Sequence, residues 1–169
     1  MNEQAFRNLI QQHQDKIYRL CRGYLYDQSL ADDLYQEVLI NLWHSLKKFQ
    51  RESALSTWIY RVTVNTAITF NRKSKRHPQR MELTSVVVDE GQQQKEAVLE
   101  KEQQLKRLQY CISQLPREER LIITLVLEDV SYKEISEIMG ISVNYTGVKI
   151  NRIKQKLGHM IESPTTQKS

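Results

Sequence analysis

Residues 130–157 read VSYKEISEIMGISVNYTGVKINRIKQKL. This stretch predicts two short helices joined by a tight turn. Ser131 and Glu134 form a capping box that begins the first helix. Gly140 can take the left-handed conformation that ends a helix, and Ser142 can cap the second helix two residues later. Two short helices with Gly in the turn between them are typical of a helix-turn-helix.

The second of these helices has an apolar stripe and, roughly a quarter turn away, a basic one. The apolar stripe consists of Thr146, Ile150, Ile153 and Leu157. The basic stripe consists of Tyr145, Lys149, Arg152 and Lys156. No Asp or Glu occurs between Glu137 and Glu162, so we expect an exposed basic helix that neutralises phosphates and reads base edges in the major groove. A merely solvated basic face is the alternative, but the caps, the turn and the stripe in register favour DNA binding.

The composition predicts an all-helical protein, because five Gly and three Pro in 169 residues leave little turn chemistry and no segment alternates with period two. The formal net charge of +5 is unevenly distributed. Residues 1–80 hold 13 Lys/Arg and 7 Asp/Glu, residues 81–108 hold 4 and 6, and residues 109–169 hold 8 and 7. Two basic parts joined by an acidic one fit a polyanionic partner that is contacted at both ends.

The sequence contains no motif for chemistry. Its four His and two Cys lack the spacing of metal ligands, and it has neither a Gly-rich phosphate loop nor a nucleophile motif. We therefore expect no catalytic residue, no metal and no cofactor. Cys21 and Cys111 lie among apolar helical residues and are expected to be buried free thiols. Without a signal peptide or an apolar run of membrane-spanning length, the protein is expected to be cytoplasmic.

The first half of the chain predicts three helices. Apolar spacing places the first at residues 3–25, and Ser29 with Asp32 is expected to cap the second. The second helix has an apolar stripe every four residues from Leu34 and a polar opposite face. That polar face consists of Asp33, Gln36, Glu37 and Asn41. Ser56 is expected to cap a third helix, with Trp58, Ile59, Val62 and Thr66 on its buried side and Arg61 and Asn65 pointing outward.

At this point the residues resemble a known family. Residues 33–43, DLYQEVLINLW, resemble the helix by which bacterial sigma factors bind core RNA polymerase. Residues 49–67, FQRESALSTWIYRVTVNTA, are similar to the promoter-melting segment of the extracytoplasmic-function (ECF, group IV) factors of the sigma-70 family. Residues 115–120, LPREER, look like the opening of the second domain of these factors. The three motifs occur in the right order and spacing over nearly the whole chain.

The resemblance implies a division of labour. Residues 1–76 would bind core polymerase and melt the −10 element, residues 77–94 would be a flexible linker, and residues 95–162 would form a helix-turn-helix domain of the region 4 (winged-helix-like) type for the −35 element. Residues 163–169 are expected to be a disordered tail. Expected partners are promoter DNA, the β′ clamp and β flap of polymerase, and an anti-sigma factor. The free protein is expected to be a monomer without membrane insertion.

The same resemblance assigns residues to three contacts. Core polymerase binding falls to Asp33, Gln36, Glu37 and Asn41. Recognition of the −35 element falls to Asn144, Tyr145, Gly147, Val148, Lys149, Asn151, Arg152 and Lys156. Recognition and melting of the −10 element fall to Phe49, Gln50, Arg51, Ser53, Ala54, Arg61, Asn65, Arg72, Lys73 and Arg76. Since the protein has no ATP site, binding of an extruded base must supply the few kcal/mol that unstacking costs.

Two positions depart from the simplest assignment. Phe49 can stack on a base or pack in the core, whereas for Trp58 we expect core packing. ECF factors commonly carry small and basic residues where Gly147 and Val148 stand. A Gly inside a helix costs about 1 kcal/mol against Ala, so close approach of the DNA backbone is the hypothesis for Gly147.

Two other functions are conceivable on the sequence alone. A dimeric helix-turn-helix regulator would explain the second half of the chain but not the polar helix and the melting segment of the first half. A helical nuclease would need a carboxylate cluster for metal, for which Asp32, Asp33 and Glu37 are the only dense candidates.

Overall fold

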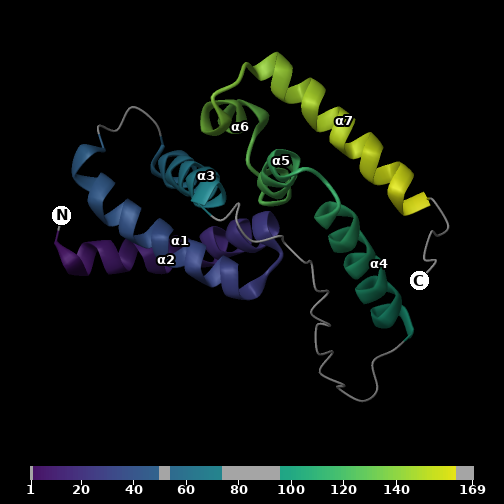
Figure 1. Ribbon diagram of the computed structural model, residues 1–169, viewed down its shortest axis with the longest axis horizontal. Helices are drawn as coiled ribbons and strands as arrows, with labels where there is room; N and C mark the ends of the chain where they lie inside the picture. Colours follow the sequence, from purple (N-terminus) through teal and green to yellow (C-terminus); the bar gives the residue numbers. More distant parts are fainter. Residues whose placement is uncertain (1, 50–53, 74–95, 163–169) are drawn as a thin grey trace.

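A computed structural model describes residues 2–49, 54–73 and 96–162, which form seven α-helices, one 3-10 turn and no strand (Figure 1). The prediction of an all-helical fold is confirmed. The helices are α1 (Glu3–Leu25), α2 (Gln28–Ser45), α3 (Leu55–Lys73), α4 (Glu96–Ser113), α5 (Arg117–Leu127), α6 (Tyr132–Met139) and α7 (Val143–Glu162), and the 3-10 turn η1 spans Leu46–Lys48. The predicted linker and the predicted tail lie outside the described residues.

In the first half of the chain, α1, α2 and α3 pack against one another. The apolar stripe predicted for α2 is confirmed, because Leu34, Val38 and Leu42 are buried. Burial of each such side chain contributes about 1.5–3 kcal/mol.

Two helices begin at other residues than the sequence predicted. The Asp27 side chain, rather than Ser29, caps α2, since its Oδ1 accepts the Leu30 N–H at 3.1 Å. Ser56 lies inside the first turn of α3, which begins at Leu55. Neighbouring capping residues compete for one helix start, and the sequence alone does not show which side chain reaches the free N–H groups.

The helix-turn-helix is formed by α6 and α7, as predicted from the caps. Ser131 Oγ accepts the Glu134 N–H at 3.2 Å, and Ser142 Oγ accepts the Tyr145 N–H at 3.1 Å. Gly140 ends α6 with φ of 70°, a conformation in which a side chain would be strained. The turn between the two helices is therefore set by local chemistry.

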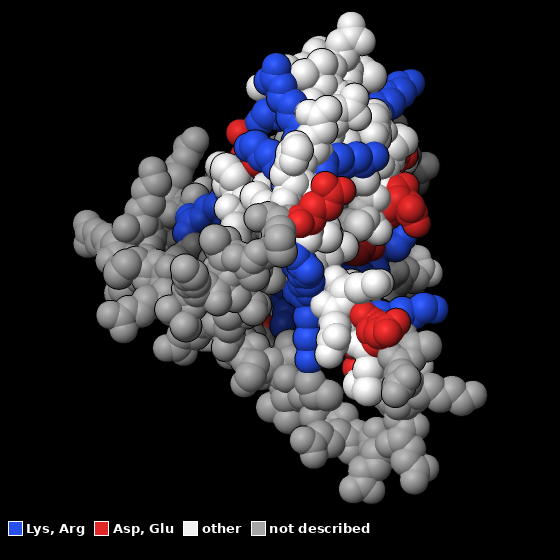
Figure 2. Space-filling model, turned by 90° about the vertical axis from the view of Figure 1, so that its right-hand side faces the viewer, with Lys and Arg blue, Asp and Glu red and all other residues white. Residues whose placement is uncertain are grey.

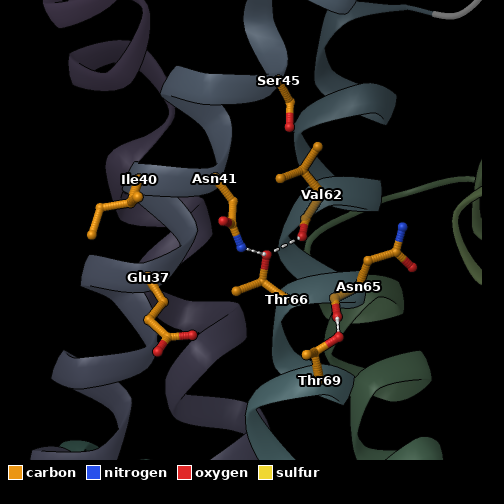
Figure 3. A pocket seen from close by; sticks show the side chains of 8 residues that line it. All are labelled: Glu37, Ile40, Asn41, Ser45, Val62, Asn65, Thr66 and Thr69. Atoms are coloured by element: carbon orange, nitrogen blue, oxygen red, sulfur yellow. Dashed lines mark hydrogen bonds between the residues drawn. The ribbon is translucent and has the colours of Figure 1, made fainter.

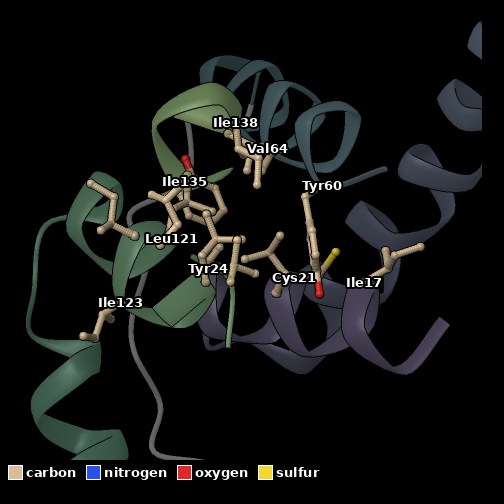
Figure 4. Close-up of a cluster of buried hydrophobic side chains, with 14 of the residues drawn as sticks. Ile17, Cys21, Tyr24, Tyr60, Val64, Leu121, Ile123, Ile135 and Ile138 are labelled. Atoms are coloured by element: carbon tan, nitrogen blue, oxygen red, sulfur yellow. The ribbon is translucent and has the colours of Figure 1, made fainter. Parts of the chain in front are cut away.

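The two halves of the chain share one buried core. Helix α5 packs on α1, and α6 packs on α3. Figure 4 shows side chains of all four helices meeting in this cluster. The labelled members are Ile17, Cys21 and Tyr24 from α1, Tyr60 and Val64 from α3, Leu121 and Ile123 from α5, and Ile135 and Ile138 from α6. The helix-turn-helix is thus docked on the N-terminal helices and does not stand apart from them.

Polar contacts and one close approach accompany the docking. Arg19 of α1 forms a two-point ion pair with Glu128, its Nε and Nη2 lying 2.5 and 2.9 Å from the two carboxylate oxygens. Gly23 of α1 lies so near α5 that a Cβ built on it would be 2.5 Å from Thr124 Oγ1. Glycine is therefore the residue that this helix contact accommodates without adjustment.

Candidate nucleic-acid interface

Helix α7 presents its outer face to solvent. The predicted inner stripe is confirmed, since Thr146, Ile150, Ile153 and Leu157 are all buried. The exposed side chains on the outer side include Asn144, Tyr145, Val148, Asn151 and Arg152. They combine hydrogen-bonding groups, which can read base edges, with one guanidinium, which can bind phosphate or guanine. The outer face of α7 is therefore suited to the major groove.

The basic stripe differs from the sequence-based expectation. Lys149 and Lys156 lie on the flank of α7 that faces α5, and each forms an ion pair there. Lys149 Nζ is 2.8 Å from Glu118 Oε1, and Lys156 Nζ is 2.7 Å from Glu119 Oε1. The expectation of exposure is wrong for Lys149, whose side chain is only 16% exposed beside Glu118. Lys156 is exposed as expected, but it is paired with Glu119.

The other flank of α7 faces α6. Lys154 Nζ lies 3.3 Å from the Tyr132 hydroxyl and 6.0 Å from the centre of its ring. Gly147 also lies on this side, and no atom comes within 4 Å of a Cβ built on it. Nothing within the described protein therefore requires glycine at this position.

The predicted polymerase-binding and melting residues meet in one groove. A groove of about 550 Å³ runs between α2 and α3 (Figure 3). Glu37 and Asn41 line it from α2, and Asn65 lines it from α3. Asn41 Nδ2 donates to Thr66 Oγ1 at 3.0 Å, and Thr66 Oγ1 in turn donates to the Val62 carbonyl at 2.7 Å. The Asn41–Thr66 bond links α2 to α3 across the groove, whereas the Thr66–Val62 bond lies within α3.

Three further residues line this groove and were not predicted, namely Ile40, Ser45 and Thr69. Helical spacing contained the signal for all three. Ile40 follows Gln36, Ser45 follows Asn41 and Thr69 follows Asn65 by four residues each, so each extends a predicted polar face by one turn. Ile40 was overlooked because it is apolar, yet it is more than half exposed at 55%.

The other predicted polymerase-binding residues, Asp33 and Gln36, are exposed on α2. Next to them, Asp32 Oδ1 accepts a hydrogen bond from the Tyr18 hydroxyl of α1 at 2.8 Å. This bond raises the pKa of the Tyr18 phenol. Within the described ranges, no three His, Cys, Asp or Glu residues gather closely enough to hold a metal ion.

The melting segment is described only in part. Phe49 packs against Trp58, with ring centres 4.9 Å apart, and both side chains are partly exposed. Arg61 is not free in solvent, since its Nη2 donates to the Glu137 carbonyl of α6 at 3.3 Å. Ala54 is exposed. Four further predicted residues, Gln50, Arg51, Ser53 and Arg76, lie outside the described residues, and for Arg72 and Lys73 only the helical backbone is described.

Burial affects the ionisation of several groups where the two halves meet. The pKa of Tyr60 is raised to about 12, chiefly because the ring is buried. The Arg120 guanidinium is also buried and donates to the Ser113 carbonyl at 3.1 Å, and its burial lowers its pKa. Cys21 and Cys111 are both buried free thiols, as predicted. None of the helices in the described part of the chain is long and apolar enough to cross a membrane.

Comparison with known proteins identifies both halves. The family model "Sigma-70 region 2" matches residues 9–77, and "Sigma-70, region 4" matches residues 105–157. The chain is 29% identical over 168 residues to the ECF RNA polymerase sigma factor SigW of Bacillus subtilis, covering 92% of this chain and 88% of SigW. It is 28% identical over 170 residues to the ECF RNA polymerase sigma-E factor of Escherichia coli K12, covering 95% and 88%.

Two solved structures share the fold. One is the sigma factor RpoE in complex with the anti-sigma factor NepR from Bartonella quintana, with a TM-score of 0.70 at 15% identity, covering 95% of this chain and 99% of that one. The other is CnrH in complex with the cytosolic domain of CnrY, with a TM-score of 0.67 at 21% identity, covering 97% and 92%.

Proposed function

Because the chain belongs to the extracytoplasmic-function group of the sigma-70 family, we propose that it binds core RNA polymerase and directs it to promoters. The protein recognises the −35 and −10 elements and melts the DNA at the latter. The observation that carries this proposal is the exposed outer face of α7 on a capped helix-turn-helix. A polar face of this kind on such a helix fits the major groove of duplex DNA.

The −35 element is read by the outer face of α7. Asn144 and Asn151 supply amide groups that can bond adenine, and Arg152 can bond guanine or phosphate. Tyr145 and Val148 supply apolar contact area on the same exposed face. The domain that carries this face spans residues 95–162 in our assignment.

The −10 element is opened by the segment around α3. Asn65 lines the α2–α3 groove, and Phe49 lies on Trp58 at the entrance to the melting segment. The amide can form hydrogen bonds with an unpaired base, and the partly exposed Phe49 ring can stack on it. Such stacking contributes about 1–3 kcal/mol per base. The neighbouring residues of the predicted melting set, Gln50, Arg51, Ser53, Ala54, Arg61, Arg72, Lys73 and Arg76, complete this contact in our proposal.

Core polymerase is bound by the exposed side of α2. Asp33 and Gln36 are exposed there, and Glu37 and Asn41 continue the same face into the groove. We assign this face to the β′ clamp and the C-terminal domain to the β flap. The protein itself carries out no reaction, since polymerase supplies the chemistry, and it acts in the cytoplasm, where an anti-sigma factor is its expected inhibitor.

Promoter binding requires the docked halves to separate. The two elements are centred about 25 base pairs apart, which corresponds to roughly 85 Å at about 3.4 Å per base pair. In the described structure, however, α6 packs directly on α3. The same protein cannot contact both elements in this arrangement, and the Arg61 side chain is released from the Glu137 carbonyl only when the halves part.

Run-off transcription with purified core polymerase tests this proposal. Promoter templates are selected from a random DNA pool by the protein–polymerase complex. We expect transcripts that begin at one defined position and depend on added protein. The variant with Asp33→Ala, Gln36→Ala and Glu37→Ala should lose polymerase binding with the fold intact, whereas Glu100→Ala on exposed α4 should not. Transcription that never begins at a defined position would contradict the proposal.

A further inference from the structure

Two lysines of helix α7 form ion pairs with carboxylates of the same chain. Lys149 and Lys156 are held by Glu118 and Glu119, which are neighbours in the first turn of α5. We propose that Glu118 and Glu119 are specificity-determining residues, which keep two lysines of the recognition helix off the DNA backbone. This inference rests on the proposed function of α7 and identifies how that helix avoids binding DNA of any sequence.

The geometry matches the two carboxylates to the two lysines. Lys149 and Lys156 are two helical turns apart on one flank of α7, so each reaches a different glutamate. Lys149 meets one oxygen of Glu118, and Lys156 meets both oxygens of Glu119, at 2.7 and 3.0 Å. Neither lysine needs to cross the outer face of α7 to make its pair.

Each pair has one shielded member. The Lys149 side chain is 16% exposed, and the Glu119 side chain is also 16% exposed. Lys149 Nζ additionally lies 5.6 Å from the centre of the Tyr145 ring. Pairs that are partly withdrawn from water are screened less by salt than fully exposed ones. The lysines are thereby held along α5 instead of moving freely in solvent.

The position of the glutamates in α5 supports the pairing. Carboxylates in the first turn of a helix are stabilised by the helix dipole, so both groups are favoured there as anions. Pro116, the residue before the helix, makes no side-chain cap, so no other side chain neutralises the positive end of that dipole. The start of α5 therefore favours the charged form of both Glu118 and Glu119, which is the form that pairs with the lysines of α7.

The resulting surface is mixed in charge. Figure 2 shows Lys and Arg interspersed with Asp and Glu on one face of the molecule, with no uninterrupted basic patch. Of the cations assigned to the −35 contact, Arg152 is exposed on the outer side, and no hydrogen bond or ion pair of its side chain is found among the described residues. The Arg152 guanidinium is therefore available to DNA, beside the amides of Asn144 and Asn151 and the exposed side chains of Tyr145 and Val148.

The size of the effect follows from counterion release. Each lysine that neutralises a phosphate adds about 0.9 to the slope of log affinity against log salt. Two freed lysines would add about 1.8, which corresponds to roughly twelvefold more loss of affinity between 50 and 200 mM salt. Most of the added affinity at low salt would be independent of sequence, because phosphate contacts carry no sequence information.

The experiment measures binding of the full chain to two DNA probes as salt is varied. One probe is a random-sequence 30-base-pair duplex, and the other is a duplex of the same length selected by the wild-type protein from a random pool. The variants are Glu118→Gln, Glu119→Gln and both together. Glu100→Gln on α4 is the matched control, since it removes the same charge from an exposed residue away from the lysine pairs.

We expect each Gln variant to steepen the salt slope on the random duplex by about 0.9 and to lower the ratio of selected to random affinity. Glu100→Gln should not steepen the slope. Lys149→Gln should leave the wild-type slope unchanged but cancel the gain of Glu118→Gln, which also identifies Lys149 as the group set free. Circular dichroism and the thermal midpoint of each variant show that the fold is kept.

Failure of the role of Glu118 and Glu119 can be distinguished from failure of the proposed function. If the wild-type protein selects a sequence but the Gln variants keep its salt slope, the role of Glu118 and Glu119 is wrong and the promoter-binding proposal stands. The same role is also overturned if Lys149→Gln lowers the slope in the wild-type background. If the wild-type protein prefers no selected duplex over the random one, even with core polymerase, the proposed function itself fails.

Discussion

The contact of α1 with α5 can be tested by adding one methyl group. A Cβ on Gly23 would lie 2.5 Å from Thr124 Oγ1 and 3.0 Å from Thr124 Cγ2. Thr124 cannot easily turn away, because its β-branched side chain is stiff and its Oγ1 donates to the Arg120 carbonyl at 2.7 Å. Gly23→Ala should therefore push α5 away from α1.

The expected magnitude comes from the clash alone. Over-packing a tight contact costs about 1–3 kcal/mol. Replacing Gly by Ala inside α1 stabilises that helix by about 1 kcal/mol, but it does so in the docked and the opened arrangement alike, so this gain cancels from their ratio. The docked arrangement is then weakened by about 1–3 kcal/mol relative to the opened one, which is about 5- to 150-fold in their ratio. The helices themselves should persist.

Pulsed electron–electron double resonance between spin labels on α2 and α7 measures the distance between the two halves of the chain. Cys introduced at His44 and His159 provides the label sites, both of which are exposed. We expect one short distance in the wild-type protein and a longer, broader population in Gly23→Ala. Gly158→Ala is the matched control, since nothing lies within 4 Å of its added Cβ.

A second substitution tests whether the clash with Thr124 causes the opening. Thr124→Ala in the Gly23→Ala background removes both clashing atoms and should restore the short distance. If Gly23→Ala alone leaves the distance distribution of the wild-type protein unchanged, or if Thr124→Ala does not reverse its effect, then the close approach of α1 and α5 does not control docking.

Three further predictions follow from the described geometry. Gly147→Ala should raise the free energy of unfolding by about 1 kcal/mol, because nothing lies within 4 Å of the added Cβ, yet it should weaken binding to a selected duplex. Thermal melting measures the first effect and a binding isotherm the second. Tighter binding would exclude close approach of the DNA backbone at this residue. Burial raises the pKa of Tyr60 from its ordinary value of 10.0 to about 12, so the stability that this group contributes is present below pH 10 and is lost as pH rises towards 12. Urea unfolding midpoints should therefore fall between pH 9 and 12. Tyr60→Phe should make that fall smaller. Ser131→Ala should cost about 1 kcal/mol of unfolding free energy in urea titrations by removing the cap of α6, whereas Ser131→Asp should retain most of the stability.

Much of the helical structure could be predicted because its signals are local. Ser131, Gly140 and Ser142 each act on N–H or C=O groups within five residues along the chain, and the buried stripe of α7 repeats with the helical period. The starts of α2 and α3 were less certain, because Asp27 and Ser29 are both good caps and only geometry selects one. The same local periodicity placed Asn65 on an outward face but did not show that it shares a groove with Glu37 and Asn41.

What the sequence determined by itself was the three helices of the first half and the helix-turn-helix with its caps. What only the tertiary structure decided was how these surfaces meet. Arg19 pairs with Glu128 over 109 residues, and Lys156 pairs with Glu119 over 37, so no periodic pattern links the partners. The physical reason is that helix formation depends on groups a few residues apart, whereas the pairing of charges and the docking of α5 on α1 depend on which distant faces are complementary in shape and charge.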